Sequence, residues 1–407
     1  MSELPSARAL PRGFRFASAS CGLKKRGHTG TLDVALIVSD PPASAAAVFT
    51  QNLVQAPPVV LSREHVRASA GAMRAVIVNS GNANCSVGPG GMVASRATAE
   101  RVAELLGCGA QQVVVCSTGV IGVPLPVERI LKAAPGLAKS LASTPHAFDG
   151  LTRAIMTTDT RPKRAAASCR IGGKTVRVAG CAKGAGMIHP NMATMLAFLA
   201  TDAAISPAML DRALRSAVST TFNAITVDGD TSTNDTVTLL ANGESGAPPI
   251  TRENGGWKKF CTALETVCKS LALQIVADGE GAQRVIEVEV RGAPSSQTAK
   301  EIAFTIANSP LVKTALAGAD PNWGRILAAG GRAGVPFDFE RVDITLAGLK
   351  VCRRGRENPF NERIAHRKML AKYVPIVVEL RSGRGHARVW TCDFTTEYVH
   401  INASYRT

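Results

Sequence analysis

The sequence predicts an α/β protein, because segments with the pattern of buried strands alternate with segments of helical period along most of the chain. The composition agrees, since 45% hydrophobic and 19% charged residues are the proportions of a folded chain. Aromatic residues are scarce at 4%, which favours helices packed closely on sheets over an aromatic binding surface. With 407 residues, the chain can form two or three ordinary cores or one large α/β body.

The N-terminal half is predicted to alternate short strands with helices. Residues 1–30 are rich in glycine and basic residues, and we expect a loop there. We expect strands at 32–38, 45–49, 74–79 and 112–116, helices at 93–106, 127–143 and 148–156, and a hairpin over 170–178. Gly107 stops the first of these helices, and Gly172-Gly173 supplies the turn of the hairpin.

The C-terminal half continues the alternation. The helix at 207–222 is the clearest, because Met209, Leu210, Leu214 and Val218 share one of its faces. Further helices are expected at 260–276 and 299–315, and strands at 224–227, 285–290, 375–380 and 387–394. The basic run 352–372 is predicted to be a solvated face of helix and loop.

Charge and cysteine usage narrow the class of protein. The net charge of +16 would suit nucleic acid or acidic metabolites, but no aromatic residues are interleaved with the basic ones, so we predict no nucleic-acid partner. The ten cysteines form no CxxC pair and no zinc-site spacing, so no metal site is expected, and a reducing cytosol is the simplest setting. Without an apolar leader or a run of about 18 apolar residues, we expect a cytoplasmic protein that crosses no membrane.

The stretch from Lys183 to Ala203 stands out. Glycines and Pro190 mark a tight turn, and an almost unbroken apolar run follows Thr194. A hydroxyl at the junction of a turn and a buried element suits a nucleophile, because the fixed backbone can supply oriented N–H groups. For an isolated Ala-Thr pair, a plain core position would be the better interpretation.

The loop from Asp228 to Asp235 has competing interpretations. Asp-x-Asp after a short apolar strand is typical of magnesium-dependent phosphohydrolases, and the loop also begins like a calcium loop. The calcium site fails because its twelfth position, which needs a glutamate, is Leu239. The phosphohydrolase lacks a supporting set of acidic and basic residues, so we expect hydrogen bonds from these side chains to nearby backbone.

One family accounts for the central stretch. Lys183-Gly-Ala-Gly-Met-Ile-His-Pro-Asn-Met-Ala-Thr-Met-Leu-Ala-Phe198 closely resembles the self-cleavage segment of the ornithine acetyltransferase family, which is bifunctional in arginine biosynthesis. Further segments resemble that family in the same order, from about Gly30 to Thr407. They are 79–84, 117–119, 228–235, 278–282, 318–325 and 402–407. A match at several separate places makes the resemblance highly specific.

The resemblance implies a layered sandwich with sheets inside and helices outside. It also implies self-cleavage between Ala193 and Thr194, giving an α fragment (1–193) and a β fragment (194–407) that assemble as two of each. The implied reaction moves an acetyl group from N-acetylornithine to glutamate through Thr194, without a cofactor or metal. It leaves open whether acetyl-CoA also serves as a donor.

The same resemblance assigns roles to individual residues. Thr118 and Gly119 would form the oxyanion hole. The substrate site would be lined by Thr157, Lys183, Thr194, Glu280, Asn402 and Thr407. Lys183 suits a carboxylate and Glu280 an ammonium group.

Two departures from the family pattern concern the substrate side: Ala224 stands where an arginine is expected, and Ser404 where an acidic residue is expected. They leave open an acetyltransferase with another amino-acid acceptor. A self-processing amidase or aminopeptidase on a related scaffold is the nearest alternative, and a basic RNA-binding protein is remote. His189 precedes Pro190 in the central stretch, and packing is its simpler interpretation over tuning the acidity near Thr194.

Overall fold

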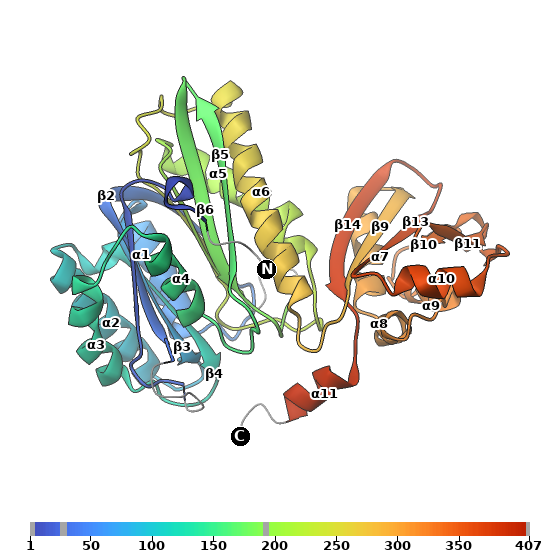
Figure 1. The fold of residues 1–407 in the computed structure, drawn as a ribbon, viewed down its shortest axis with the longest axis horizontal. Helices are drawn as coiled ribbons and strands as arrows, with labels where there is room; N and C mark the ends of the chain where they lie inside the picture. The colour runs from blue at the N-terminus through green and yellow to red at the C-terminus, as the bar shows by residue number, and fades with distance from the viewer. Residues whose placement is uncertain (1–4, 25–30, 190–194, 404–407) are drawn as a thin grey trace. The chain divides into compact units, whose positions relative to one another are not determined.

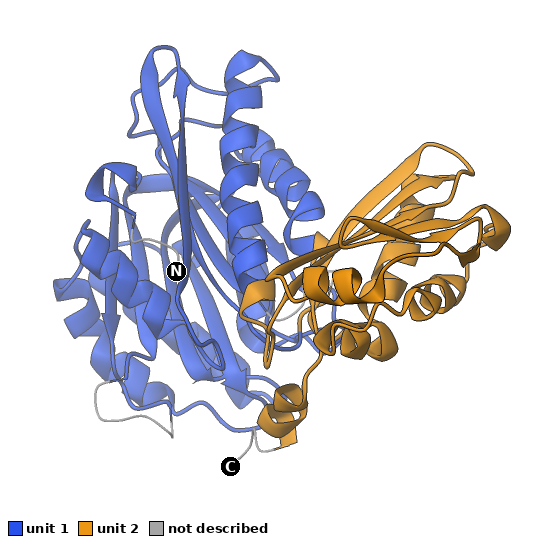
Figure 2. Cartoon of the chain, turned by 45° about the vertical axis from the view of Figure 1, so that its right-hand side comes forward, with its two compact units in different colours: residues 1–187, 191–223, 230–275 blue, residues 188–190, 224–229, 276–407 orange. Residues whose placement is uncertain are grey.

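Two β-sheets carry the fold, and each is the centre of its own unit (Figure 2). The structure, a computed structural model, describes residues 5–24, 31–189 and 195–403. Unit 1 comprises residues 1–187, 191–223 and 230–275, and unit 2 comprises 188–190, 224–229 and 276–407. These units differ from the two predicted fragments, which are defined by one peptide bond and stay a prediction.

The sheet of unit 1 has eight strands within the described ranges. They are β1 (Phe14–Ala19), β2 (Val34–Phe49), β3 (Ala72–Asn82), β4 (Val113–Val120), β5 (Lys163–Ile171), β6 (Lys174–Lys183), β7 (Leu196–Thr201) and β8 (Thr236–Ala241). The order is β4-β3-β2-β8-β7-β6-β5, and β1 pairs with β2. The β3–β4 and β7–β8 pairs are parallel, and the others are antiparallel.

Helices cover both faces of this sheet (Figure 1). On one face, Val34 and Leu36 share a core with α1 (Pro57–Ala68), α2 (Gly90–Leu106) and α3 (Val127–Lys139). On the other, Ala35 and Ile37 pack with Phe148 and Leu151 of α4 (Pro145–Ala154). The alternation follows from the two-residue period of a strand. The predicted α/β class is therefore confirmed, and in this unit the sheet lies inside its helices.

Two further helices complete unit 1. Helix α5 (Pro207–Thr220) packs on β2 and β8. Helix α6 (Gly255–Ala277) lies along β5, where the Gln274 amide bonds the backbone N–H and C=O of Arg164 at 3.2 and 3.1 Å. By length and composition α6 could cross a membrane, but half of its most apolar stretch is buried in the protein, and one such helix is weak evidence for a membrane span.

Unit 2 is built on a six-stranded sheet of order β12-β11-β10-β13-β9-β14. The strands are β9 (Val285–Ala293), β10 (Asp343–Leu346), β11 (Leu349–Arg353), β12 (Arg356–Glu357), β13 (Tyr373–Glu379) and β14 (Gly385–Cys392). The helices are α7 (Ser296–Ala307), α8 (Pro310–Ala317), α9 (Trp323–Gly331), α10 (Glu362–Met369) and α11 (Thr396–Ala403). Alternate residues of β9, such as Val288 and Val290, share a core with Ile302 and Ile306 of α7.

Several expected elements have different boundaries. The expected N-terminal loop contains β1, whose Phe14 and Phe16 are buried. The strands expected at 32–38 and 45–49 are one strand, β2, whose pairing with β3 is irregular between Val38 and Ala43 around the Pro41-Pro42 pair.

Other corrections concern the C-terminal half. Residues 224–227 form no strand: a 3-10 helix ends at Ala224, and Ile225 makes a single bridge to Trp390. The helix expected at 299–315 is two helices, because Ser309 caps α8 and Pro310 has no N–H to continue α7. The basic run 352–372 is exposed at its arginines, as predicted for a solvated face; they are Arg353, Arg354, Arg356, Arg363 and Arg367. Its first part, however, is the antiparallel pair β11–β12 and not the expected helix or loop.

Candidate active site

The structure describes six of the predicted site residues, four in unit 1 and two in unit 2. Those of unit 1 are Thr118, Gly119, Thr157 and Lys183, and those of unit 2 are Glu280 and Asn402. Ala193, Thr194 and Thr407 lie outside the described residues.

Thr118 and Gly119 lie at the end of β4, beside Gly81 of β3. Gly119 has φ +133°, and a Cβ atom there would lie 2.4 Å from the carbonyl carbon of Gly81 and 2.5 Å from the nitrogen of Asn82. No side chain fits in that space, so the local geometry of the predicted oxyanion hole requires glycine. The Gly81–Asn82 segment, which reads as an ordinary turn in sequence, is what presses against it.

Gly119→Ala is expected to lower kcat for the predicted acetyl transfer by about 10²-fold or more, because the Gly119 N–H must move when β3 and β4 separate. It should also lower the free energy of unfolding by about 2 kcal/mol, through the clash and the strained φ. Steady-state kinetics and urea unfolding measure the two effects.

Gly136→Ala is the matched control. Gly136 lies within α3, and nothing approaches within 4 Å of its added Cβ. Alanine there should leave kcat unchanged and stabilise the helix slightly. Equal kinetics in the two variants would contradict a role for the Gly119 backbone.

Lys183 connects the end of β4 to the central stretch. It is the last residue of β6, only 2% exposed, and its Nζ donates to Oγ1 of Thr118 at 3.3 Å. It also pairs in register with Leu196 of β7, two residues beyond Thr194 in the chain. An ammonium group has no acceptor lone pair, so the Thr118 oxygen accepts and its own hydrogen remains available for another acceptor.

Asp159, which no sequence motif singles out, connects Thr157 with the start of the central stretch. Its two carboxylate oxygens accept from the backbone N–H of Thr157 at 2.9 Å and of Gly184 at 2.7 Å. Lys163 is also buried, and its Nζ lies 2.5 Å from Oδ1 of Asp159, the oxygen that accepts from Gly184. The only sequence signal is the Asp-x-x-x-Lys spacing after Thr157-Thr158, which is common in ordinary ion pairs.

The charge state of Asp159 follows from these contacts. Burial alone would raise its pKa, but the charges of Lys163 and Lys183 and the hydrogen bond from Gly184 lower the pKa to about 2. The carboxylate is thus ionised at neutral pH. For Lys24 nearby, burial outweighs the charges of Asp33 and Asp159 and lowers the pKa of its ammonium group.

Asn234 and Asp235, in the polar loop introduced above, fix the backbone next to Thr118 and next to Thr194. The Asn234 amide donates to the carbonyl oxygens of Ala83 at 2.7 Å and Ser117 at 2.9 Å. Oδ1 of Asp235 accepts from the N–H of Met195 at 2.8 Å, at the residue after Thr194. The predicted hydrogen bonds of this loop to nearby backbone are confirmed.

Unit 2 contains a second polar pair. Glu280 lies between α6 and β9 and is 8% exposed, and its Oε2 accepts from the side-chain amide of Asn402 in α11 at 2.7 Å. Gly281, at φ +72°, has the backbone nitrogen of Tyr398 2.6 Å from the position of a Cβ. The glycine therefore lets α11 approach the Glu280 loop.

His189 and Ala224 of unit 2 both lie in packed surroundings. The His189 ring packs edge-on against Phe304, with centroids 5.9 Å apart, and its Nδ1 lies 3.4 Å from the Asn308 amide. These contacts support the packing interpretation. Ala224 is buried, and Ser404 lies outside the described residues. Among the described residues, no group of three or more His, Cys, Asp or Glu side chains could hold a metal ion.

Comparison with known proteins gives consistent matches over nearly the full length. The model of the ArgJ family matches residues 15–407. The chain is 48% identical over 397 residues to a Geobacter sulfurreducens protein, covering 97% of this chain and 99% of that protein. It is 47% identical over 407 residues to a Symbiobacterium thermophilum protein, covering both chains completely. Both relatives are named arginine biosynthesis bifunctional protein ArgJ.

Two solved structures of similar chains cover about half of this chain. A crystal structure of an ArgJ protein from Bacillus halodurans matches at 44% identity with a TM-score of 0.50, covering 51% of this chain and 98% of that one. An ornithine acetyltransferase from Mycobacterium tuberculosis, solved with ornithine, matches at 37% identity with a TM-score of 0.39, covering 45% of this chain and 93% of that one. Family model and full-length relatives agree, and the chain belongs to the ArgJ family.

Proposed function

We propose that this chain is a self-processing acetyltransferase that moves the acetyl group of N-acetylornithine to glutamate through an acetyl-threonine intermediate. The observation that carries the proposal is the buried contact of Lys183 with Thr118 at the end of β4, in a chain of the ArgJ family. That contact leaves the Thr118 hydrogen available to an oxyanion, as acyl transfer requires. Acetylornithine-dependent formation of N-acetylglutamate by the purified chain tests it.

Maturation comes first in this mechanism. The Thr194 hydroxyl attacks the Ala193 carbonyl carbon, the acyl group shifts from nitrogen to oxygen, and water cleaves the ester. The products are fragments 1–193 and 194–407, and the second begins with a free Thr194 amino group. The length of the Bacillus halodurans chain, which corresponds to about half of this one, supports processing of this kind.

Catalysis then uses the same hydroxyl twice. The Thr194 amino group, with a reference pKa of about 7.7–8.0, accepts the hydroxyl proton as Oγ attacks the acetyl carbonyl of acetylornithine. The proton passes to the leaving ornithine nitrogen as the C–N bond breaks. The amine of glutamate next attacks the acetyl ester, returns its proton through the amino group, and restores the hydroxyl.

The oxyanion of each tetrahedral intermediate needs donors that are already in place. The Thr118 hydroxyl and the Gly119 N–H are those donors in our proposal. Asp159 supports them indirectly, because it accepts from Gly184 and attracts the Lys183 ammonium group that contacts Thr118. A prearranged donor of this type is typically worth about 2.7–4 kcal/mol of barrier stabilisation.

Substrate recognition in the proposal uses groups of opposite charge. Lys183 and Thr157 would bind the carboxylate side of the amino acid, and Glu280 would bind the ornithine ammonium group while Asn402 and Thr407 hold its position. The Asn402 amide already orients one oxygen of Glu280, and the second oxygen can accept from a ligand. Ala224 leaves the choice of acceptor to be tested with several amino acids.

Glu280→Gln is expected to raise KM for acetylornithine by about tenfold or more, because a hydrogen bond to a charged group is worth about 1.5–3 kcal/mol. It should leave the rate of self-cleavage unchanged. Glu397→Gln, an exposed carboxylate of α11, is the control and should leave KM unaltered. An unchanged KM in Glu280→Gln would remove this assignment.

The remaining features concern the whole enzyme. We infer a cytoplasmic enzyme of two α and two β fragments that needs no cofactor, with acetyl-CoA as an additional donor to be tested in the same assay. The amidase alternative predicts that acetylornithine is hydrolysed at the same rate with or without glutamate. A rate that rises with glutamate concentration favours the transferase.

A further inference from the structure

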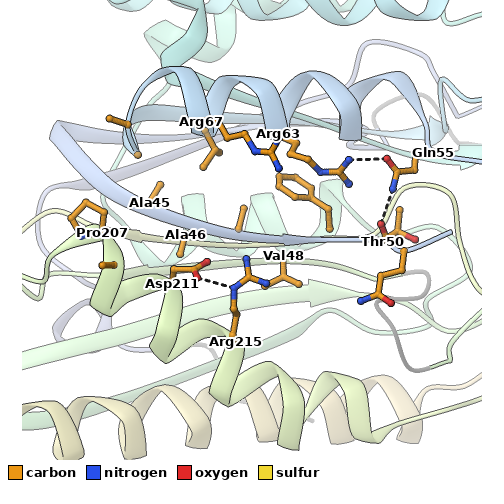
Figure 3. A pocket seen from close by; sticks show the side chains of 17 residues that line it. Ala45, Ala46, Val48, Thr50, Gln55, Arg63, Arg67, Pro207, Asp211 and Arg215 are labelled. Atoms are coloured by element: carbon orange, nitrogen blue, oxygen red, sulfur yellow. Dashed lines mark hydrogen bonds and ion pairs between the residues drawn. The ribbon is translucent and has the colours of Figure 1, made fainter. Parts of the chain in front are cut away.

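Unit 1 contains a pocket of about 530 Å³ that none of the assigned site residues lines (Figure 3). Its walls are α1 and α5, and its floor is the C-terminal half of β2, from Ala45 to Phe49. The volume lies in the range of about 300–1,000 Å³ that is usual for small-molecule sites.

Three guanidinium groups face this pocket (Figure 3). Arg63 is half-buried and held in place, because its Nη1 donates to Gln55 at 2.9 Å and its guanidinium lies 5.4 Å from the centroid of the Phe49 ring. Arg67 follows one turn later on α1 and is exposed. Arg215 of α5 is paired with Asp211 at 2.7 Å, so the excess positive charge lies on the α1 side.

The floor of the pocket adds backbone donors. Strand β2 pairs with β8 through Phe49, whereas its pairing with β3 ends at Ser44. The N–H of Ala45 points away from β8 and donates to Gly71 at 2.7 Å. Because alternate residues of a strand direct their N–H and C=O groups to the same side, those of Ala47 and Phe49 face the pocket. Within the described residues, no strand pairs with this edge.

A chain of hydrogen bonds leads from the pocket to the residue after the predicted nucleophile. Arg63 donates to Gln55, whose amide donates to the carbonyl oxygen of Thr50 at 3.0 Å. The N–H of Thr50 donates to the backbone oxygen of Asp235 at 2.9 Å, and the Asp235 carboxylate accepts from Met195 at 2.8 Å. Every member of this chain belongs to unit 1.

We propose that this pocket binds a small molecule bearing a carboxylate or phosphate group, and that its occupancy changes the rate of acetyl transfer. The oxyanion is held by Arg63 and Arg67, since a guanidinium fork fits such groups with two parallel hydrogen bonds. The N–H groups of Ala47 and Phe49 serve the polar remainder of the ligand. Asp211 disfavours a second anionic group beside Arg215. The rate effect rests on the proposed function, whereas the binding does not.

The binding test is calorimetric titration of the purified full chain with inorganic phosphate and, separately, with succinate, each against sodium chloride of equal ionic strength. One saturable site per chain is expected for at least one probe, and the stronger probe identifies the anionic group. Arg63→Gln and Arg67→Gln should each weaken binding by about tenfold, from the loss of a charge-assisted hydrogen bond.

Arg212→Gln is the matched control, because Arg212 lies on α5, pairs with Glu253 at 2.5 Å and does not line the pocket. It should bind both probes as the wild type does. No saturable binding of either probe, or binding that the Arg63 and Arg67 substitutions leave unchanged, would overturn the proposal. Binding that both substitutions leave unchanged would mean that the probe binds elsewhere, for example at Lys183.

The rate test measures initial rates of acetyl transfer with and without the bound probe. At least a twofold change on adding the probe is expected in the wild type, and no change on adding the probe is expected in the Arg63→Gln/Arg67→Gln double variant, each protein being compared with its own rate without probe. Binding without a rate effect would refute the coupling and keep the site. A chain without acetyl transfer would refute the proposed function, while the titration would still decide the site.

Discussion

Thr194→Ala should abolish acetyl transfer, with kcat falling by about 10⁴-fold or more, because the same hydroxyl performs the cleavage and carries the acetyl group. Thr194→Ser keeps a hydroxyl and should retain self-cleavage and part of the transfer rate. The measurement is the initial rate of N-acetylglutamate formation for the three proteins at equal concentration. A Thr194→Ala variant with more than a few per cent of the wild-type rate would contradict a covalent role for Thr194.

Asp159→Asn is expected to lower kcat by about 10²-fold or more and also to lower the stability of the fold. Both carboxylate oxygens of Asp159 accept from N–H groups, those of Thr157 and Gly184. An amide has one oxygen, so its NH₂ group would face one of these donors. The substitution also leaves two lysines without their shared negative charge, and breaking a buried pair typically costs about 3–5 kcal/mol.

The double variant Asp159→Asn/Lys163→Met separates positioning from stability. Replacing Lys163 as well should recover much of the lost free energy of unfolding, because the amide introduced at position 159 then no longer faces the buried ammonium group of Lys163. The rate of acetyl transfer should stay low, since Lys183 and Gly184 still lack the carboxylate. Recovery of both stability and rate would show that Asp159 only balances the charge of Lys163.

The pH dependence of stability gives an independent check on Asp159. Its pKa is lowered in the folded protein from 3.8 to about 2, so its stabilising contribution is present above the unfolded pKa of roughly 3.9. That contribution is lost as the pH falls through about 2. The difference in unfolding free energy between wild type and Asp159→Asn should therefore be constant from pH 5 to 8 and shrink below pH 4.

The elements that were predicted correctly have strong local signals. Helix α2 ends at Leu106 and is capped by Gly107, which adopts φ +63°, and the β5–β6 hairpin turns at Gly172-Gly173. Strand β1 gave a weaker signal, because its alternation of buried and polar residues is limited to Phe14-Arg15-Phe16 and is followed by the small residues Ala17-Ser18-Ala19. The break between α7 and α8 depends on Pro310, which a count of helical periodicity alone passes over.

The candidate site was predictable only as far as its motifs extend. Thr118, Gly119 and Lys183 were predicted from segments that resemble a known family. The structure adds that the space at Gly119 is too small for a Cβ atom and that Lys183 is a buried ammonium group. Asp159 and Lys163 stand in no distinctive pattern. Their importance arises from a tertiary contact with Gly184, 25 positions away from Asp159, which no local rule contains.

The most direct test of the central claim is the intact mass of the purified protein under denaturing conditions, before and after brief exposure to acetylornithine. The account predicts two fragments meeting at Ala193 and Thr194, and a gain of one acetyl group on the fragment that begins with Thr194. Thr194→Ala should give one full-length chain that gains nothing. A single uncut chain for the wild type, or an acetyl group on the 1–193 fragment, would contradict the mechanism.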